Sequence, residues 1–151
     1  MKTKTVNVLI ADDDQDDCLM IQEAFRECRI ANRLQFVHDG EALIDYLKRR
    51  PPFDDEKQFP TPGLILLDLN MPLKDGREAL MEIKSDAALR AIPVVVLTTS
   101  STEEDVLRSY GIGVNSFITK PVSFSRLIEV VRALGHYWLN IVELPIERTG
   151  A

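Results

Sequence analysis

The segment Leu64-Ile65-Leu66-Leu67-Asp68 consists of four large apolar residues in a row followed by a carboxylate. A short, continuous apolar run of this kind is typical of a strand that is buried on both faces, as strands at the centre of a parallel sheet are. The segment Val94 to Thr98 has the same pattern and also ends on a polar residue. Together the two segments predict the centre of a parallel sheet with both faces covered.

Further strand-like segments alternate with helical ones on both sides of these two. The remaining strands are predicted at Val6 to Ala11, Leu34 to His38 and Ser116 to Thr119. Helices are predicted at about Gln15 to Ile30, Gly40 to Arg50, Gly76 to Ser85, Ser101 to just before Gly111, and from after Ser123 to Leu134. A strand and a helix repeated five times predict an α/β protein with a doubly wound, five-stranded (βα)5 parallel sheet. The proline-containing segment Arg49 to Gly63 is expected to be an exposed spacer loop.

The composition limits the class of protein. With 151 residues, of which 45% are hydrophobic, the chain fits one globular domain, expected over residues 1–135, followed by a tail over residues 136–151. No segment approaches the roughly 20 apolar residues that a membrane span needs, and the N-terminus does not resemble a signal peptide. A cytoplasmic protein without a membrane partner is therefore expected. The net charge of −6 argues against nucleic acid as a direct partner, because phosphate backbones are bound by basic surfaces.

Polar residues end or follow four of the predicted strands. These residues are Asp12 and Asp13 after the first strand, Asp68 at the end of the third, Thr98 at the end of the fourth, and Lys120 after the fifth. In open parallel sheets, ligands bind outside the carboxyl ends of the strands. We therefore expect these five side chains to converge at one edge of the sheet.

The chemistry of these residues points to a cation and a phosphoryl group. Two carboxylates about 4 Å apart repel each other by about 4 kcal/mol at an effective dielectric constant of about 20, so a cluster of Asp12, Asp13 and Asp68 needs a cation or a proton. Carboxylate oxygens select Mg²⁺ or Mn²⁺, and Mg²⁺ usually leaves coordination positions to water and to a substrate phosphate. An aspartate can accept a phosphoryl group, whose oxygens the Lys120 ammonium and the Thr98 hydroxyl would contact.

Three further aspartates fall at the start of the predicted first helix. They are Asp14, Asp16 and Asp17. Negative charge at this end of a helix interacts favourably with the helix dipole, by about 0.3 to 1 kcal/mol per residue. We interpret these three residues as a solvated helix start rather than as part of the metal site.

The order and spacing of the site residues resemble the receiver domain of two-component response regulators over about Val6 to Leu134. The matching segments are Leu9-Ile10-Ala11-Asp12-Asp13, Leu64 to Pro72 followed by Asp75-Gly76, Pro93 to Thr98, and Lys120-Pro121. The resemblance implies a flavodoxin-like receiver fold with strand order 2-1-3-4-5. It also implies a signalling protein rather than an enzyme, one that assists its own phosphorylation and dephosphorylation.

The same resemblance assigns roles to individual residues. It implies that Asp68 is phosphorylated from a histidine of a sensor kinase or of a phosphotransfer protein. Asp13, Asp68 and the backbone carbonyl of Asn70 would bind Mg²⁺ directly, and Asp12 would bind it through water. Phe117 would occupy the position of an aromatic switch residue.

Residues beside the site are covered by the resemblance as well. Lys120-Pro121 would form a cis peptide that aims the lysine into the site. Thr99 stands where the family usually has Ala or Gly, and Ser100 follows it, so a larger side chain there can slow the access of water or phosphodonor. Phosphorylation would draw the Thr98 hydroxyl inward, admit the Phe117 ring and change the surface of the fourth helix, fifth strand and fifth helix.

A narrower resemblance concerns the end of the chain. Tyr137 to Pro145, together with Leu97 to Ser100 and Asn115 to Val122, is similar to receivers that partner bacterial phytochromes, which would make the kinase a light sensor. The apolar tail is expected to form a symmetric homodimer together with the fifth helix, or else to pack back on that helix. The tail residues concerned are Tyr137, Trp138, Leu139 and Ile141.

Three other functions compete with this interpretation. A Mg²⁺-dependent phosphatase of the haloacid dehalogenase type needs a second carboxyl two residues after the nucleophile, where this chain has Asn70. A flavodoxin-like nucleotide binder cradles phosphate in a Gly/Ser/Thr-rich loop after the first strand, where Asp12 to Asp17 would repel it. A receiver that binds partners without being phosphorylated usually lacks a site residue, and none is missing from this sequence.

Overall fold

The computed structural model of the protein describes residues 7–28, 33–98, 116–119 and 123–134, with the backbone alone for 98, 116–119 and 134. Within these ranges the chain forms a five-stranded, parallel sheet in the order β2-β1-β3-β4-β5. The strands are β1 (Val8–Ala11), β2 (Leu34–Val37), β3 (Leu64–Asp68), β4 (Val94–Thr98) and β5 (Ser116–Thr119). The predicted α/β fold and strand order are confirmed, and the two continuous apolar segments are the central strand and its neighbour.

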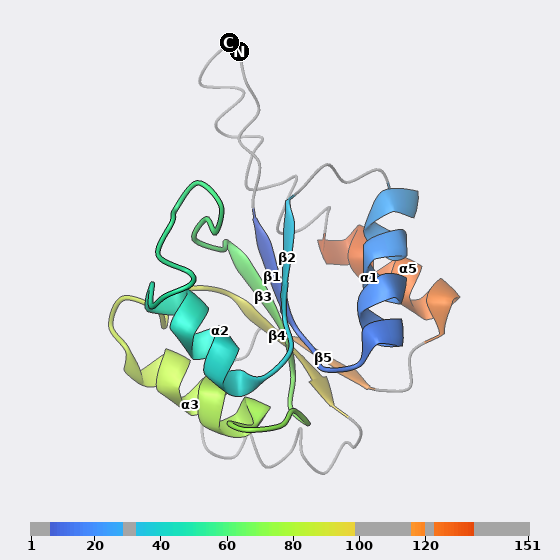
Figure 1. The fold of residues 1–151 in the computed structure, drawn as a ribbon. Coiled ribbons are helices and arrows are strands. Elements are labelled where there is room, and N and C mark those ends of the chain that lie inside the picture. Colours follow the sequence, from blue (N-terminus) through green and yellow to red (C-terminus); the bar gives the residue numbers. More distant parts are fainter. Residues whose placement is uncertain (1–6, 29–32, 99–115, 120–122, 135–151) are drawn as a thin grey trace.

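Helices cover both faces of the sheet (Figure 1). On one face lie α1 (Gln15–Glu27) and α5 (Phe124–Leu134), and on the other lie α2 (Gly40–Leu47) and α3 (Gly76–Ser85). None of the helices in the described ranges is long and apolar enough to span a membrane. The helix predicted from Ser101 to just before Gly111 and the tail from residue 136 onward lie outside the described residues.

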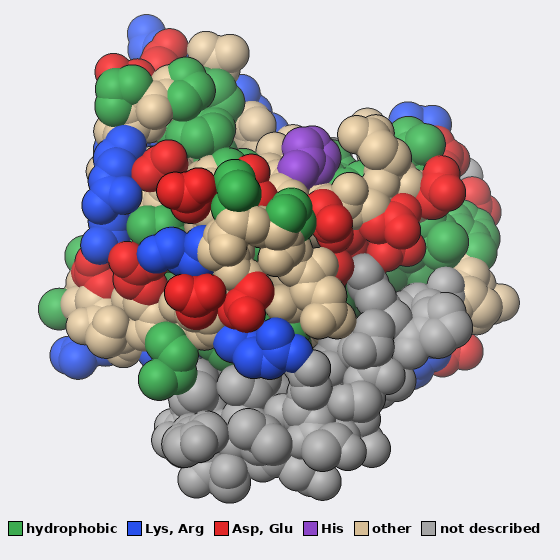
Figure 2. Space-filling view, turned by 60° about the horizontal axis from the view of Figure 1, so that its bottom comes forward, with side chains coloured by type: hydrophobic (Ala, Val, Ile, Leu, Met, Phe, Trp, Pro, Cys, Tyr) green, Lys and Arg blue, Asp and Glu red, His purple; other side chains and the backbone are tan. Residues whose placement is uncertain are grey.

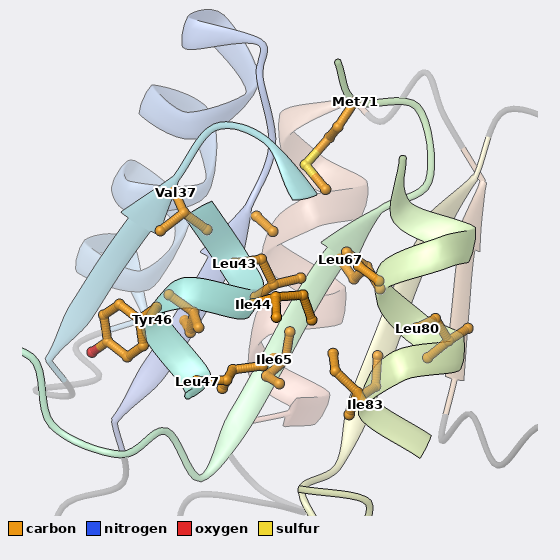
Figure 3. Close-up of a cluster of buried hydrophobic side chains, with 14 of the residues drawn as sticks. Val37, Leu43, Ile44, Tyr46, Leu47, Ile65, Leu67, Met71, Leu80 and Ile83 are labelled. Carbon is orange, nitrogen blue, oxygen red and sulfur yellow. The ribbon is translucent and has the colours of Figure 1, made fainter. Parts of the chain in front are cut away.

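The central strand contributes side chains to two separate hydrophobic clusters, because successive side chains of a strand point to opposite faces. Ile65 and Leu67 pack in one cluster with α2 and α3, whereas Leu64 and Leu66 pack in the other with α1 and α5. The labelled side chains in Figure 3 show how the first cluster joins α2 and α3 to the sheet. Both faces of β3 are therefore buried, which is why its sequence lacks the alternation of polar and apolar residues that a half-exposed strand has.

Three aspartates cap helices that start at the carboxyl edge of the sheet. The Asp14 side chain accepts hydrogen bonds from the backbone N–H groups of Asp16 and Asp17, at 2.8 and 3.1 Å. Asp39 and Asp75 cap α2 and α3 in the same way. Each cap satisfies N–H groups that have no partner inside the helix. The interpretation of the three early aspartates as a helix start is confirmed.

Two helices end earlier than the sequence predicts. The first, α1, ends at Glu27 rather than at about Ile30. The second, α2, ends at Leu47 rather than at about Arg50, because Arg49 has a φ of 60°, which a right-handed helix does not accommodate. The chain therefore leaves α2 in a turn that begins the long loop before β3.

The loop between α2 and β3 is packed against the protein over part of its length. Phe53 and Phe59 lie against the Tyr46 ring, with ring centroids 5.3 and 5.8 Å from it. The Tyr46 hydroxyl donates a hydrogen bond to the Pro60 carbonyl at 2.8 Å, and burial raises the pKa of this tyrosine. The Arg33 guanidinium donates to two further carbonyl groups of the loop. The predicted exposure holds for the charged residues from Asp54 to Lys57, but it is wrong for the aromatic residues of the loop, which attach it to α2.

Candidate functional site

The carboxyl ends of the strands meet at one edge of the sheet, and the predicted aspartates of the site lie at this edge. In the register of the sheet, Asp68 of β3 lies opposite Leu97 of β4. Asp12 and Asp13 directly follow Ala11, the last residue of β1, which lies opposite Leu67 of β3. Figure 2 looks toward this edge and shows acidic side chains gathered on it. The topology alone therefore brings aspartates from distant parts of the chain to one place.

Three carboxylates form a cluster at this edge. One oxygen from each of Asp12, Asp13 and Asp68 lies within 4.8 Å of the others. Asp12 is fully buried and Asp68 is 3% exposed, whereas Asp13 is exposed. Carboxylates at this separation repel one another, so the cluster lowers stability unless a cation or a proton compensates the charge. These oxygens fit a hard divalent cation such as Mg²⁺ or Mn²⁺, with the side of Asp13 open to solvent.

Backbone hydrogen bonds orient the two buried carboxylates. The Asp14 N–H donates to Asp12 Oδ1 at 2.9 Å, and the Asn70 N–H donates to Asp68 Oδ1 at 3.0 Å. Both are local turns in which an aspartate bonds the backbone two residues later. The orientation of the candidate ligands is therefore set by the chain itself, because neither bond depends on a bound cation.

A histidine that directly follows the neighbouring strand β2 supports Asp12. The Nδ1 atom of His38 lies 3.0 Å from the Asp12 carbonyl oxygen, and because a carbonyl only accepts, this nitrogen carries the proton of the bond. The Asp12 N–H donates in turn to the Val37 carbonyl at 3.0 Å. From the sequence, His38 is simply a polar residue at the end of a strand. No sequence signal marks its contact, which joins residues 26 positions apart.

Two glycines confine the loop between β3 and α3. The Gly76 N–H donates to the Leu69 carbonyl at 2.9 Å, and a Cβ atom at Gly76 would lie 2.3 Å from the Asp68 carbonyl oxygen. A Cβ atom at Gly40, the first residue of α2, would lie 1.8 Å from the Lys74 carbonyl oxygen. Neither position has room for a side chain. The loop that follows Asp68 is therefore held between the starts of two helices.

The remaining predicted site residues are described in part or not at all. Thr98 ends β4 and pairs with Thr119, the last residue of β5, so its backbone belongs to the same edge. Phe117 of β5 pairs with Val96 of β4. The predicted residues outside the described ranges are Thr99, Ser100, Lys120, Pro121, Tyr137, Trp138, Leu139 and Ile141. The predicted cis peptide before Pro121 falls among them.

The sequence and the fold both match a known family. The family model described as the response regulator receiver domain matches residues 8–132. A curated relative, the response regulator Rcp1 of Synechocystis sp., is 41% identical to this chain over 138 residues, which are 91% of this chain and 92% of Rcp1. The similarity therefore extends over nearly all of both proteins.

Two solved structures share the fold over a similar length. The phosphorylated cyanobacterial phytochrome response regulator RcpA is 39% identical to this chain, with a TM-score of 0.80 over 91% of this chain and 96% of RcpA. The Mn²⁺-bound form of Rcp1 is also 39% identical, with a TM-score of 0.77 over 89% of this chain and 95% of Rcp1. The likeness thus concerns the whole domain rather than a single motif.

Proposed function

The chain belongs to the response regulator receiver domain family, and on this premise we propose that Asp68 accepts a phosphoryl group from a histidine of a sensor kinase or of a phosphotransfer protein. The observation that supports this function is the carboxylate cluster. Asp68 ends the central strand, and oxygens of Asp12 and Asp13 lie within 4.8 Å of one of its own. Transfer of a phosphoryl group needs a nucleophile and positive charge near the transferring oxygens. This cluster supplies the nucleophile and ligands for a cation beside it.

The proposed direct ligands of Mg²⁺, or of Mn²⁺ in its place, are Asp13, Asp68 and the backbone carbonyl of Asn70. Asp12 is proposed to bind the cation through water. When bound, the cation would neutralise charge on the carboxylates and on the phosphoryl oxygens. The burial and the fixed orientation of two carboxylates support a preformed site, and the Mn²⁺-bound form of the relative Rcp1 supports a divalent cation.

In the proposed reaction, an oxygen of Asp68 forms a bond to phosphorus while the bond from phosphorus to the donor nitrogen breaks. The electron pair of the broken bond stays on the donor's histidine ring. The Lys120 ammonium and the Thr98 hydroxyl are proposed to contact phosphoryl oxygens, since one follows and the other ends a strand at this edge. Movement of Thr98 toward the new dianion would allow the Phe117 ring to move and would change the surface near α5. Thr99 is proposed to slow the access of water, and so the loss of the phosphoryl group.

The proposed donor is a bacterial phytochrome that acts as a histidine kinase. Support comes from RcpA, a phytochrome response regulator that is 39% identical to this chain over 91% of its length. A light-sensing kinase would then control the charge on Asp68. The phosphorylated receiver would signal by presenting a changed surface to another protein.

The function is tested by incubating the protein with acetyl phosphate and Mg²⁺ and measuring the intact mass. We expect one added phosphoryl group on the wild-type chain, none on Asp68→Asn, and weak labelling in EDTA. Asp16→Asn is the matched control, because Asp16 is an exposed aspartate of α1 outside the cluster, and it should be labelled like the wild type. Undiminished labelling of Asp68→Asn would place the acceptor elsewhere.

We also propose that the chain forms a symmetric homodimer through α5 and the tail. The support is the apolar sequence of the tail, which includes Tyr137, Trp138, Leu139 and Ile141. Light scattering at micromolar concentration should give the mass of two chains, and Trp138→Glu should shift the protein toward one chain without preventing labelling by acetyl phosphate. A wild-type mass of one chain, with and without phosphodonor, would refute the dimer.

A further inference from the structure

The residue Leu73, in the loop between β3 and α3, has an unusually exposed apolar side chain. It is 73% exposed, more than any other large apolar side chain whose burial the structure describes. It lies five residues after Asp68, next to the edge that holds the carboxylate cluster. The side chain therefore gains little from burial within this chain.

The backbone of Leu73 adds a second cost. Its φ of 65° falls in the left-handed region, which is unfavourable for residues with a Cβ atom. Glycine or asparagine would adopt this conformation more readily and would expose less apolar surface. Conformations of this kind persist where the surroundings fix them, and they are frequent at functional sites. A leucine here is unfavourable for the isolated protein in both respects.

The exposure of Leu73 does not result from a loose loop. Met71, two residues earlier, is buried in the hydrophobic cluster under α2 and α3 (Figure 3). Lys74, the next residue, pairs with Glu82 of α3 at 2.7 Å between Nζ and Oε2, and this hydrogen bond raises the pKa of the lysine. The Lys74 carbonyl also packs against Gly40. The chain is thus fixed on both sides of Leu73, which presents the side chain to solvent in a defined place.

The position of this loop relative to the acceptor limits what can cover it. The hydrogen bond from Gly76 to Leu69 closes the loop at its base, so Leu73 lies near the midpoint of the chain between them. Asp68 is only 3% exposed. A protein that delivers a phosphoryl group to Asp68 must bring its reacting atom into this edge, and its surface must then lie over the neighbouring loop.

We propose that the Leu73 side chain is a docking contact for the protein phosphodonor and is buried by that protein during transfer. Its role as a docking contact rests on the proposed function and adds a recognition residue to it. A small donor such as acetyl phosphate can reach Asp68 without covering the loop. Leu73 should therefore matter for transfer from a protein and not for transfer from a small molecule.

The test compares two donors on the variant Leu73→Asn. One donor is an autophosphorylated bacterial phytochrome kinase that transfers its phosphoryl group to the wild-type chain, and the other is acetyl phosphate with Mg²⁺. Asparagine tolerates the left-handed conformation, so the variant should unfold at the same urea concentration as the wild type or a higher one. We expect kcat/KM for transfer from the kinase to fall by about tenfold or more, mainly through KM. The rate with acetyl phosphate should stay within about twofold.

Two further variants separate docking from other effects. Leu73→Met keeps an apolar side chain and should retain most of the rate with the kinase. Met81→Gln removes another exposed apolar side chain, 52% exposed on α3, and should leave both rates unchanged. Equal transfer from the kinase to Leu73→Asn and to the wild type would overturn the docking role, as would an equal loss with both donors. If acetyl phosphate does not label Asp68 in the wild type, the proposed function fails, and the docking role fails with it.

Discussion

Asp13→Asn should remove most of the affinity for Mg²⁺ and at the same time stabilise the metal-free protein. Both effects have one cause, because Asp13 faces the buried carboxylates of Asp12 and Asp68, with one oxygen of each within 4.8 Å. Without a cation the three charges repel one another, and asparagine keeps the shape of the side chain without its charge. With a cation the same change removes a charged ligand, so the affinity should fall on the order of 100-fold or more.

The gain in stability is smaller than the bare charges suggest. At this separation and an effective dielectric constant of about 20, each pair of carboxylates repels by roughly 3 kcal/mol. Asp13 is exposed, however, so water and salt screen its interactions with the two buried groups. We therefore expect the free energy of unfolding of the metal-free protein to rise by about 1 kcal/mol.

Urea unfolding in EDTA measures the stability of the metal-free protein, and calorimetric titration with MgCl₂ or MnCl₂ measures the affinity for the cation. Asp16→Asn is the control for the loss of one negative charge near the edge. Because Asp16 lies in the first turn of α1, its replacement should slightly lower the stability and leave the cation affinity unchanged. A metal-free Asp13→Asn protein that is less stable than the wild type, or one that binds Mg²⁺ equally well, would contradict the proposed site.

The sheet could be predicted from the sequence because its signals are local. The continuous apolar run from Leu64 to Leu67 indicates a strand that is buried on both faces, as a central strand is. The caps at Asp14 and Asp39 are also local, since each side chain bonds N–H groups of its own first turn. Once the strands alternate with helices, the convergence of strand ends at one edge follows from topology. The carboxylate cluster could therefore be predicted from the sequence alone.

The features that the sequence did not predict depend on an unusual backbone conformation and on contacts between separate segments of the chain. The end of α2 is set by the left-handed backbone of Arg49, and the following loop packs on Tyr46 through Phe53 and Phe59. A composition rich in proline and charge is compatible with either an exposed or an attached loop. The contact of His38 with Asp12 joins the residues that follow two neighbouring strands, and no sequence pattern near either residue indicates it.

The loop after Asp68 shows the same limit within the site itself. The motif at Asp75-Gly76 is visible in the sequence, but the reason for the glycine is the carbonyl oxygen of Asp68, which leaves no room for a Cβ atom. The need for glycine at position 40 is still harder to see in the sequence, because the carbonyl group that excludes a side chain there belongs to Lys74, in a different loop. Sequence patterns therefore located the carboxylates of the cluster, whereas the packing that fixes their backbone became visible only in three dimensions.

Replacing Gly76 with alanine should destabilise the protein and slow the phosphorylation of Asp68, although the change adds only one methyl group. The new Cβ atom would lie 2.3 Å from the Asp68 carbonyl oxygen and 2.5 Å from the Leu69 Cα atom. Both atoms belong to the backbone at the end of β3, so no side-chain rotation can relieve the contact. The start of α3 and the end of β3 must therefore move apart.

This separation disturbs both the core and the acceptor. Ala79, Leu80 and Ile83 of α3 are fully buried, and they lose contact with the sheet when the helix shifts. Overpacking a core position typically costs about 1 to 3 kcal/mol, and we expect a loss of about 2 to 3 kcal/mol in the free energy of unfolding because the clash involves backbone alone. Asp68 moves with its own backbone, so labelling by acetyl phosphate at saturating Mg²⁺ should slow on the order of 10-fold to 100-fold.

Urea denaturation measures the loss of stability, and the rate of labelling is measured below the urea concentration at which unfolding begins, so that only folded protein is compared. Glu78→Ala is the matched control, because Glu78 is an exposed residue in the same turn of α3 and alanine favours a helix. It should cost less than about 1 kcal/mol and leave the labelling rate unchanged. If Gly76→Ala behaves like this control, the loop can shift without effect, and its close approach to β3 is not what holds Asp68 in place.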